Sequence, residues 1–408
     1  MRAATLLAAA ALGVGLAACD RDSNPVSVDE APNAEMSQQG NVVYEVMHLP
    51  SLGGSASAGN GINNGELVVG SSTIGGAGSP SHATAWDGGA PVDLGTLGGP
   101  GTNSSVAWPG VNTNGRMIVG ISETDEPGGD AWACRFFLAA PTGNQCLGFL
   151  YRDGTMTELS PFDGGTNSFA TGVNARGEIV GWAENGVEDP TCNAPVELQF
   201  RAAKWDPATG AMTELPPLPG DSTSAATAIS NSGRVVGISG DCANAVGGFS
   251  ARHAVLWERD GSVIDIGNIG GEAWHTPMDI NERGEIVGFG NPASAPGDAF
   301  AFHAFYRSAD GKVEDLEVLP GQARSQALGI NNRGQVVGQS AGSPDGRRAF
   351  YWDGGELIDL NDLVDPEYEG TLLTAGHIND AGVITGIALD PVTGDEVAFV
   401  ARPRGGGS

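Results

Sequence analysis

The chain has 408 residues, with 49 acidic and 20 basic side chains and a formal net charge of −29. Nucleic acid binds basic surfaces that displace its counterions, so this composition excludes it as the expected partner. The acidity is typical of a solubility or salt adaptation, and a basic ligand is the alternative. Length alone would suggest two or three domains, but an internal repeat spans most of the chain and predicts a single ring.

The first 19 residues have the pattern of an export signal. One Arg precedes a run of Ala, Leu, Gly and Val that is short for a spanning helix and ends in Leu16-Ala17-Ala18-Cys19. These four residues resemble the lipobox of bacterial lipoproteins, which implies cleavage before Cys19 and a membrane anchor of acyl chains such as palmitate on that residue. An ordinary signal peptide with an incidental Cys is the alternative. We expect residues 1–18 to be the signal peptide and the polar residues 19–40 to be a flexible tether.

Seven versions of one unit follow in residues 41–403, and the copy at Ser325–Leu363 shows its plan. Two short runs flank the turn Asn331-Asn332-Arg333-Gly334, an aromatic run ends at Trp352, and an acidic-apolar run follows a Gly-Gly turn. A four-stranded antiparallel sheet cannot bury both faces alone, so copies at a spacing of about 50 residues predict a β-propeller. We expect an all-β, seven-bladed propeller with small residues near the axis and large aromatics outside.

The copies differ in ways that place the ring closure and the loops. The last copy lacks a fourth strand, and residues 41–52 match one, so the N-terminal strand should complete the last blade and leave no sheet edge unpaired. Residues 404–408 form a Gly-rich tail. Insertions between the second and third strands are expected at residues 123–145, 184–199 and 240–252. The seven first turns begin at Asn63, Asn112, Asn174, Ser230, Asn281, Asn331 and Asn379.

Three recurring elements make the chain resemble the HAF-repeat family of extracellular bacterial proteins. They are the run His253-Ala254-Val255-Leu256-Trp257, the element from Gly329 to Gly338, and the exit from Asp93 to Gly99. The resemblance covers residues 41–403. It implies a propeller with an extracytoplasmic address and brings no activity or catalytic residues. Blades 2, 3, 6 and 7 lack the His, and blade 4 has Ser230 in place of Asn.

Four cysteines besides Cys19 lie in the insertions, namely Cys134, Cys146, Cys192 and Cys242. An even number in an exported chain suggests two disulfides, for which three pairings exist. We favour Cys134 with Cys146 within one loop and Cys192 with Cys242 between blades. Zinc is the alternative, but the spacing usual for structural zinc is missing, so no metal or other cofactor is expected.

The eight tryptophans fall into two groups. Four end third strands and are expected in the core. The others lie on or near the face that carries the insertions, and with two phenylalanines they suggest an aromatic binding surface over blades 2 to 5. Small cores under the long loops are the alternative. The candidate binding residues are Trp108, Trp132, Phe136, Phe137, Trp182 and Trp274.

Candidates for catalysis are few. His275, Asp279 and His377 lie on or near first strands, where a His and a carboxylate at the channel mouth could act in acid-base chemistry. Local hydrogen-bonded substitutions are the alternative interpretation of these three residues. The sequence therefore favours a lipid-anchored, monomeric binding or scaffold module for an envelope protein or glycan over an enzyme. A polysaccharide lyase or glycoside hydrolase using the channel mouth, and a purely structural envelope protein, are the other two hypotheses.

Overall fold

A computed structural model describes residues 43–76, 78–99, 101, 103–108, 115–128, 132–243, 247–295, 300–343 and 346–404. The expected signal peptide, the expected lipidation site Cys19, the expected tether, residues 405–408 and the first turn at Asn112 lie outside the described residues.

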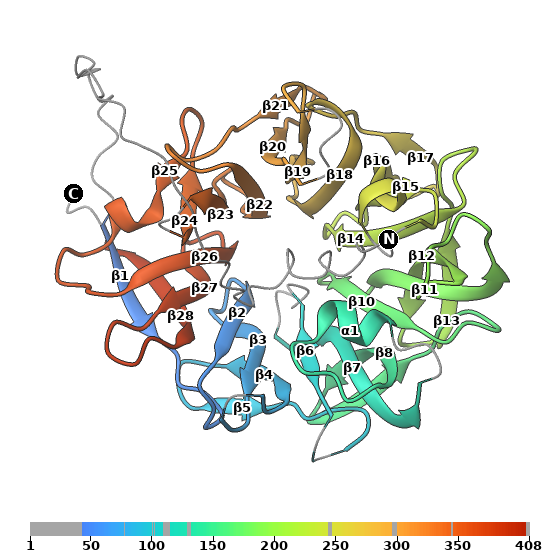
Figure 1. The fold of residues 1–408 in the computed structure, drawn as a ribbon, viewed down its shortest axis with the longest axis horizontal. Coiled ribbons are helices and arrows are strands. Elements are labelled where there is room, and N and C mark those ends of the chain that lie inside the picture. Colours follow the sequence, from blue (N-terminus) through green and yellow to red (C-terminus); the bar gives the residue numbers. More distant parts are fainter. Residues whose placement is uncertain are drawn as a thin grey trace, which may run out of the picture.

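The described residues form seven four-stranded antiparallel sheets arranged as a ring (Figure 1), so the predicted seven-bladed propeller is confirmed. Blade 1 contains β2 (Ser57–Ile62), β3 (Val68–Thr73), β4 (Ser81–Trp86) and β5 (Pro91–Asp93); blade 2 contains β6 (Ser105–Ala107), β7 (Ile118–Pro127), β8 (Asn144–Arg152) and β9 (Thr155–Leu159). Blade 3 contains β10 (Ser168–Val173), β11 (Ile179–Glu188), β12 (Leu198–Asp206) and β13 (Ala211–Leu215); blade 4 contains β14 (Thr223–Ile229), β15 (Val235–Gly240), β16 (His253–Trp257) and β17 (Val263–Asp265).

Blade 5 contains β18 (Gly270–Ile280), β19 (Ile286–Pro292), β20 (His303–Arg307) and β21 (Val313–Asp315); blade 6 contains β22 (Arg324–Ile330), β23 (Val336–Ser343), β24 (Gly346–Trp352) and β25 (Ile358–Asp359). Blade 7 combines β26 (Thr371–Ile378), β27 (Ile384–Leu389) and β28 (Glu396–Arg404) with the N-terminal strand β1 (Val43–His48). The helices are α1 (Trp132–Phe137), which the sequence did not predict, and the 3₁₀ turns η2 (Gly248–Ala251) and η3 (Leu360–Leu363). No helix in the described part is long and apolar enough to cross a membrane.

The ring closes as the missing fourth strand predicted. β1 pairs antiparallel with β28, from Val43 opposite Arg404 to His48 opposite Phe399. Side-chain contacts also stabilise this pairing of β1 with β28: His48 contacts Asp390 through Nδ1 at 3.2 Å and Tyr368 through Nε2 at 2.9 Å. Every blade of the described ring therefore has four strands, and the outermost strand of the last blade comes from the other end of the chain.

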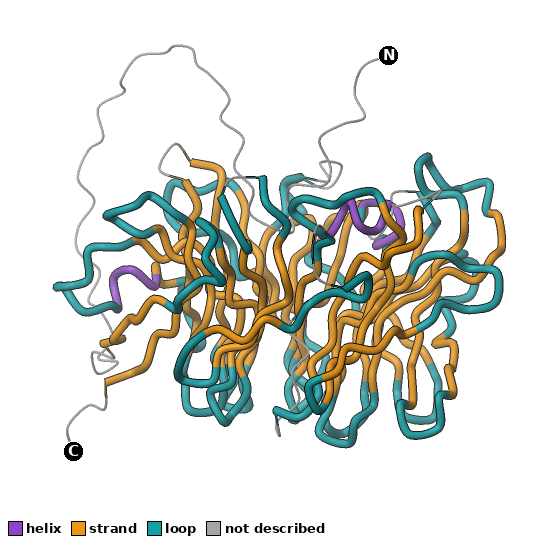
Figure 2. Tube along the Cα trace, turned by 90° about the horizontal axis from the view of Figure 1, so that it is seen from below, coloured by secondary structure: helices purple, strands orange, loops and turns teal. Residues whose placement is uncertain are grey.

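The first turns hold neighbouring blades together on one face of the ring. The side-chain oxygen of Asn331 accepts the backbone N–H groups of Arg333 and Gln335, which shapes its own turn, while its amide donates to the carbonyl of Asn379 in the next blade at 2.9 Å. Asn379 does the same to Asn63, across the closure of the ring. The short turns lie together on the lower face in Figure 2, whereas α1 lies on the upper face.

A column of first-strand serines makes a second contact between blades. Ser224 of blade 4 accepts the N–H of Ala202 and donates to the carbonyl of Leu215, both in blade 3. Ser105, Ser168 and Ser325 bridge their preceding blades in the same way. The small residues expected near the axis thus serve close packing between blades as well as space at the centre.

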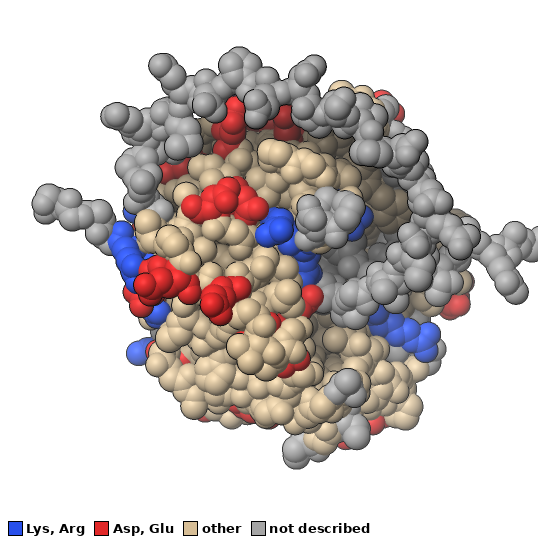
Figure 3. Space-filling model, turned by 60° about the vertical axis from the view of Figure 1, so that its left-hand side comes forward, with Lys and Arg blue, Asp and Glu red and all other residues tan. Residues whose placement is uncertain are grey.

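Large apolar side chains fill the spaces between blades. Trp86, Trp257, Phe149, Phe350 and Phe399 are almost fully buried, as expected for residues at or near the ends of third strands. The repeat histidines of blades 1, 4 and 5 each contact the fourth-strand aspartate of their own blade. On the face in Figure 3, acidic side chains form separate groups with several basic side chains beside them.

Two disulfides join the pairs favoured from the sequence, Cys134 with Cys146 and Cys192 with Cys242. The first closes the blade 2 insertion, and the second ties the insertion of blade 3 to that of blade 4. Disulfides persist in oxidising compartments, so the ring belongs outside the cytoplasm.

Candidate functional site

The centre of the ring holds a pocket of about 160 Å³ to which all seven blades contribute. In six blades the first strand contains a β-bulge near its C-terminal end, where one residue has no partner in the second strand; β18 and β26 have a further irregularity earlier in the strand. That residue lines the pocket in each case, and in blade 2 the residue just after β6 does so. These seven residues are Asn60, Trp108, Thr171, Thr227, Met278, Leu328 and Gly376.

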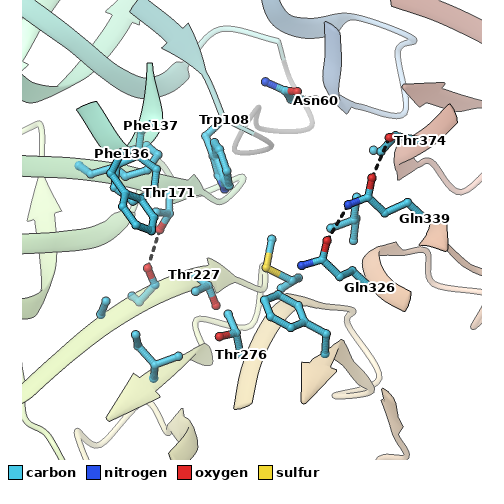
Figure 4. Close-up of a pocket in the computed structure, with 18 of the residues that line it drawn as sticks. Asn60, Trp108, Phe136, Phe137, Thr171, Thr227, Thr276, Gln326, Gln339 and Thr374 are labelled. Carbon is cyan, nitrogen blue, oxygen red and sulfur yellow. Dashed lines mark hydrogen bonds between the residues drawn. The ribbon is translucent and has the colours of Figure 1, made fainter. Parts of the chain in front are cut away.

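The pocket has two chemically different halves (Figure 4). Blades 2, 3 and 5 supply aromatic rings and blade 4 supplies aliphatic side chains, with one threonine from each of blades 3 to 5, whereas blades 1, 6 and 7 supply the amide and hydroxyl groups that face them. The aromatic residues are Trp108, Phe136, Phe137, Phe169, Trp182, Trp274 and Phe289. The polar half contains Asn60, Gln326, Gln339 and Thr374, with Arg347 the one charged residue among the described lining. A pocket that is mainly apolar and has a few convergent polar groups is typical of a ligand site.

A short chain of hydrogen bonds orders the polar half. Thr374 Oγ1 donates to Gln339 Oε1 at 2.9 Å, and Gln339 Nε2 donates to Gln326 Oε1 at 2.6 Å. The amide nitrogen of Gln326 comes at the end of this chain and points into the pocket (Figure 4). Because the chain holds the oxygen of Gln326 away, this residue presents N–H donors to a ligand. Arg347 donates to Glu396 at 3.0 Å, so its charge is already balanced.

The aromatic half continues into a core beneath the insertions, which corrects the prediction of an exposed aromatic surface. Trp132 is 3% exposed and stacks on Trp182 with ring centroids 5.1 Å apart, and its indole N–H donates to Glu184 at 2.8 Å. Trp274 is 6% exposed and donates to Thr276. The loops are rich enough in apolar groups to bury these rings, so the tryptophans pack inward instead of facing solvent.

The other three candidate aromatic residues differ in exposure. Trp108 and Phe136 are partly exposed, whereas Phe137 is buried and packs edge-on against both. Of the six candidates, five line the pocket and Trp132 lies behind it. The structure therefore brings most of them together, around a cavity and not on a flat platform.

Two buried glutamates, which were not among the candidate residues, hold two insertions in place. Glu184 is fully buried, and its carboxylate accepts bonds from Trp132, from the backbone and side chain of Thr166, and from the backbone and side chain of Asn167. Glu123 occupies the matching place in blade 2 and accepts from Ser104 and Thr142. Both glutamates lie inside their second strands, directly before the register shift at which the insertion begins, and this shared position is the signal that could have identified them.

His275 does not lie at the channel mouth. It occupies the place in β18 that Ser224 holds in β14, between two blades, and it is 1% exposed. Its Nε2 contacts the carbonyl of Gly271 at 3.1 Å, and burial lowers the pKa of its imidazole. His275 is thus a buried, neutral replacement for an inter-blade serine, and the prediction of a catalytic position is wrong.

Asp279 and His377 do meet. His377 Nε2 lies 3.4 Å from Asp279 Oδ2, although the two residues belong to blades 5 and 7. Gly329 of blade 6 lies between them, where a Cβ would come within 3.0 Å of the His377 Cα. Asp279 also accepts the N–H groups of Ile280 and Ile330, and His377 Nδ1 is buried with no hydrogen-bond partner among the described residues. Neither side chain is among the described residues that line the pocket, but the residues before them, Met278 and Gly376, are, so this pair bridges blades next to the pocket.

The described residues contain no group of three His, Cys, Asp or Glu side chains arranged to hold a metal ion.

Comparisons with known proteins support the fold alone. No protein-family model matches the chain, and no curated protein sequence is significantly similar to it. Among solved structures, it is similar to an oligogalacturonate lyase in complex with manganese, at 11% identity and a TM-score of 0.51, over 90% of this chain and 95% of that one.

Two peptide or amide hydrolases are also similar in structure. The Pyrococcus horikoshii acylaminoacyl peptidase is 11% identical, with a TM-score of 0.44 over 83% of this chain and 49% of that one. A puromycin hydrolase is 15% identical, with a TM-score of 0.45 over 86% and 52%. This chain thus spans about half the length of each hydrolase.

Proposed function

We propose that this protein is an extracytoplasmic binding module that takes an apolar group of a ligand into the pocket at the centre of its propeller. The observation that carries the proposal is the division of the pocket into an aromatic half and an amide half. Its volume of about 160 Å³ is close to that of a cavity that accepts one benzene ring. One bulky side chain or one sugar ring is therefore the size of group that fits.

A segment of an envelope protein is the ligand class that the pocket favours. Sugar rings stack on open aromatic faces, but Trp182, Phe169 and Trp274 pack against other rings and are almost fully buried. An aromatic or branched side chain needs only an apolar cavity, and a neighbouring carbonyl oxygen can accept from Gln326. A glycan is the second candidate, because partly exposed Trp108 faces the amides of the polar half.

The expected lipid on Cys19 would hold this module at a membrane, and the HAF-repeat resemblance supports the same envelope location. A glycoside hydrolase gains no support from the pocket, because such enzymes generally use a pair of carboxylates and the described lining contains none.

The test uses two small probes, N-acetylphenylalanine amide for the protein ligand and chitobiose for the glycan. Binding is measured through tryptophan fluorescence, since three indoles line the pocket. We expect the phenylalanine probe to bind and Gln326→Leu and Trp108→Ala to weaken it. Val392→Ala, an apolar truncation at an 89% exposed site outside the pocket, is the matched control.

Preferential binding of chitobiose would favour the glycan candidate. If neither probe binds the folded protein, or if all three variants behave alike, the pocket is not the ligand site.

A further inference from the structure

Two of the first turns carry the same ion pair between an arginine and a glutamate. In blade 3, Arg176 is the third residue of the turn and lies against Gly233, the turn glycine of blade 4. Glu178, two residues later, pairs with this arginine. Blade 5 repeats the arrangement with Arg283 and Glu285, which are 2.6 Å apart. Each of these guanidinium groups therefore reaches the next blade while its charge is balanced by its own blade.

Blade 4 departs from this pattern at both positions. Its turn reads Ser230-Asn231-Ser232-Gly233-Arg234, with serine at the third position and arginine at the fifth. Arg234 also lies against the next turn glycine, Gly284 of blade 5. Because Arg234 occupies the place of the glutamate, the turn has no carboxylate of its own to balance the charge. Within the described chain, the Arg234 guanidinium has no hydrogen bond or ion pair.

Blade 5 adds a second arginine at another break in the repeat. The residue opposite the first residue of the second strand is tryptophan in blades 1, 3, 4 and 6, and it is Arg307 in blade 5. The guanidinium of Arg307 lies against the turn at Gly311, with Nη2 3.3 Å from where a Cβ would stand. Its Nε is buried and has no hydrogen-bond partner among the described residues. A buried donor without an acceptor is unfavourable, so this position lacks an acceptor group.

The two arginines are close enough to repel each other. Burial lowers the pKa of the Arg307 guanidinium, the charge of Arg234 lowers it further, and the weaker attraction of Asp310 opposes both effects. Repulsion from Arg234 thus outweighs attraction by the carboxylate that acts on Arg307.

The carboxylates around the pair are engaged with other groups. Glu282 accepts a backbone N–H of blade 4 at 2.7 Å, Glu285 pairs with Arg283, and Asp310 accepts the hydroxyl of Ser308. The charged side chains of the flanking turns are Glu258, Arg259, Asp260, Glu282, Arg283, Glu285, Asp310 and Lys312. No carboxylate of the described residues forms an ion pair with Arg234 or Arg307. Two unpaired guanidinium groups therefore meet between blades 4 and 5.

We propose that Arg234 and Arg307 form a binding site for a tetrahedral oxyanion, the phosphate or sulfate group of a ligand. A guanidinium binds an oxyanion through paired N–H donors, and a tetrahedral anion has oxygens enough for two guanidinium groups on different sides. A carboxylate has both oxygens at one end and is served by a single arginine. The anion relieves the repulsion between the arginines and supplies an acceptor to Arg307 Nε.

The site lies on the face with the short turns and is separate from the central pocket. Arg234 directly follows the first turn of blade 4, and Arg307 pairs with Ile286, which follows the first turn of blade 5 (Figure 2). Neither arginine is among the described residues that line the central pocket. The oxyanion site is therefore independent of the binding function proposed above.

The test uses the exported chain with Cys19→Ser, which cannot take a lipid anchor. Inorganic phosphate, sulfate and acetate are each titrated calorimetrically at low ionic strength. The first variant, Ser232→Arg with Arg234→Glu, copies the turn of blade 3, so that a guanidinium can still reach Gly284 with its charge balanced. The second, Arg307→Trp, gives blade 5 the tryptophan of the other blades. The matched control is Arg135→Gln, at an exposed arginine of α1 on the opposite face.

We expect the wild type to bind phosphate or sulfate more tightly than acetate, and the affinity to fall about tenfold or more in each variant, because each removes one charge-assisted pair of hydrogen bonds. Arg135→Gln should bind like the wild type. Tighter binding of phosphate assigns the site to phosphorylated ligands, and tighter binding of sulfate assigns it to sulfated ones.

The proposal is overturned if the wild type binds neither tetrahedral anion, or if acetate binds as tightly. It is also overturned if the folded turn variant keeps the affinity of the wild type, or if Arg135→Gln loses as much as the two variants. Should the turn variant unfold, Arg307→Trp provides the same comparison.

Discussion

Replacing Glu184 by Gln removes one acceptor oxygen from a fully buried group that receives five hydrogen bonds. Oε1 accepts from Trp132 and the Asn167 amide, and Oε2 accepts from Thr166 and the Asn167 backbone. Whichever oxygen becomes NH₂, at least two donors lose their acceptor and face another donor. An unsatisfied buried donor costs about 1–3 kcal/mol, while removal of the buried charge offsets part of the loss. We expect a net destabilisation of about 2–4 kcal/mol.

The free energy of unfolding is measured by urea titration, followed by far-UV circular dichroism. Glu188→Gln is the matched control, because it makes the same change at an exposed residue of the same strand, and it should stay within about 0.5 kcal/mol of wild type. Glu184→Gln should also weaken ligand binding, since Trp132 stacks on Trp182 at the pocket. If the two variants are equally stable, Glu184 does not hold the insertion and the reasoning is refuted.

Three further predictions test the ring itself. Gly329→Ala should destabilise by about 1–3 kcal/mol, because a Cβ would crowd His377; unchanged unfolding would contradict the close packing. The pKa of Glu178 is lowered from 4.5 to about 2, so its ionised carboxylate stabilises the folded protein above pH 4.5, and this stabilisation disappears as the pH falls toward 2. The difference in melting temperature between wild type and Glu178→Gln should therefore shrink over that pH range. A difference that stays constant with pH would contradict this role of Glu178. The double variant Cys192→Ser, Cys242→Ser removes a disulfide between residues 50 apart in sequence and should lower the free energy of unfolding, measured by urea titration, by about 4 kcal/mol. A decrease below about 1 kcal/mol would mean that this disulfide restricts the unfolded chain very little.

The repeat made most of the fold predictable. Each copy carries the same turn asparagine and the same gradient of side-chain size, so the number of blades, the insertions and the N-terminal closing strand follow from aligning the copies. The disulfide pairs followed from which loops the ring brings together. Helix α1 did not, because it belongs to an insertion with no second copy to compare.

The site was less predictable because it depends on side chains that break the repeat. Trp132 and Trp182 break the repeat, but Trp132 is held by Glu184, whose other hydrogen-bond donors come from a second, separate segment at Thr166 and Asn167. The contact between Asp279 of blade 5 and His377 of blade 7 depends on Gly329 of blade 6, because a side chain at Gly329 would occupy the space between them. Aligning the copies puts these three residues in one column, and that alignment is the signal that could have revealed the pair.

The pairing of β1 with β28 also sets the order of events when the protein is made. Val43 pairs with Arg404, so the seventh blade cannot form until nearly the whole chain has been synthesised. Closure of the ring is therefore one of the last steps of folding, because it joins the first and last strands of the described chain after β28 has been synthesised.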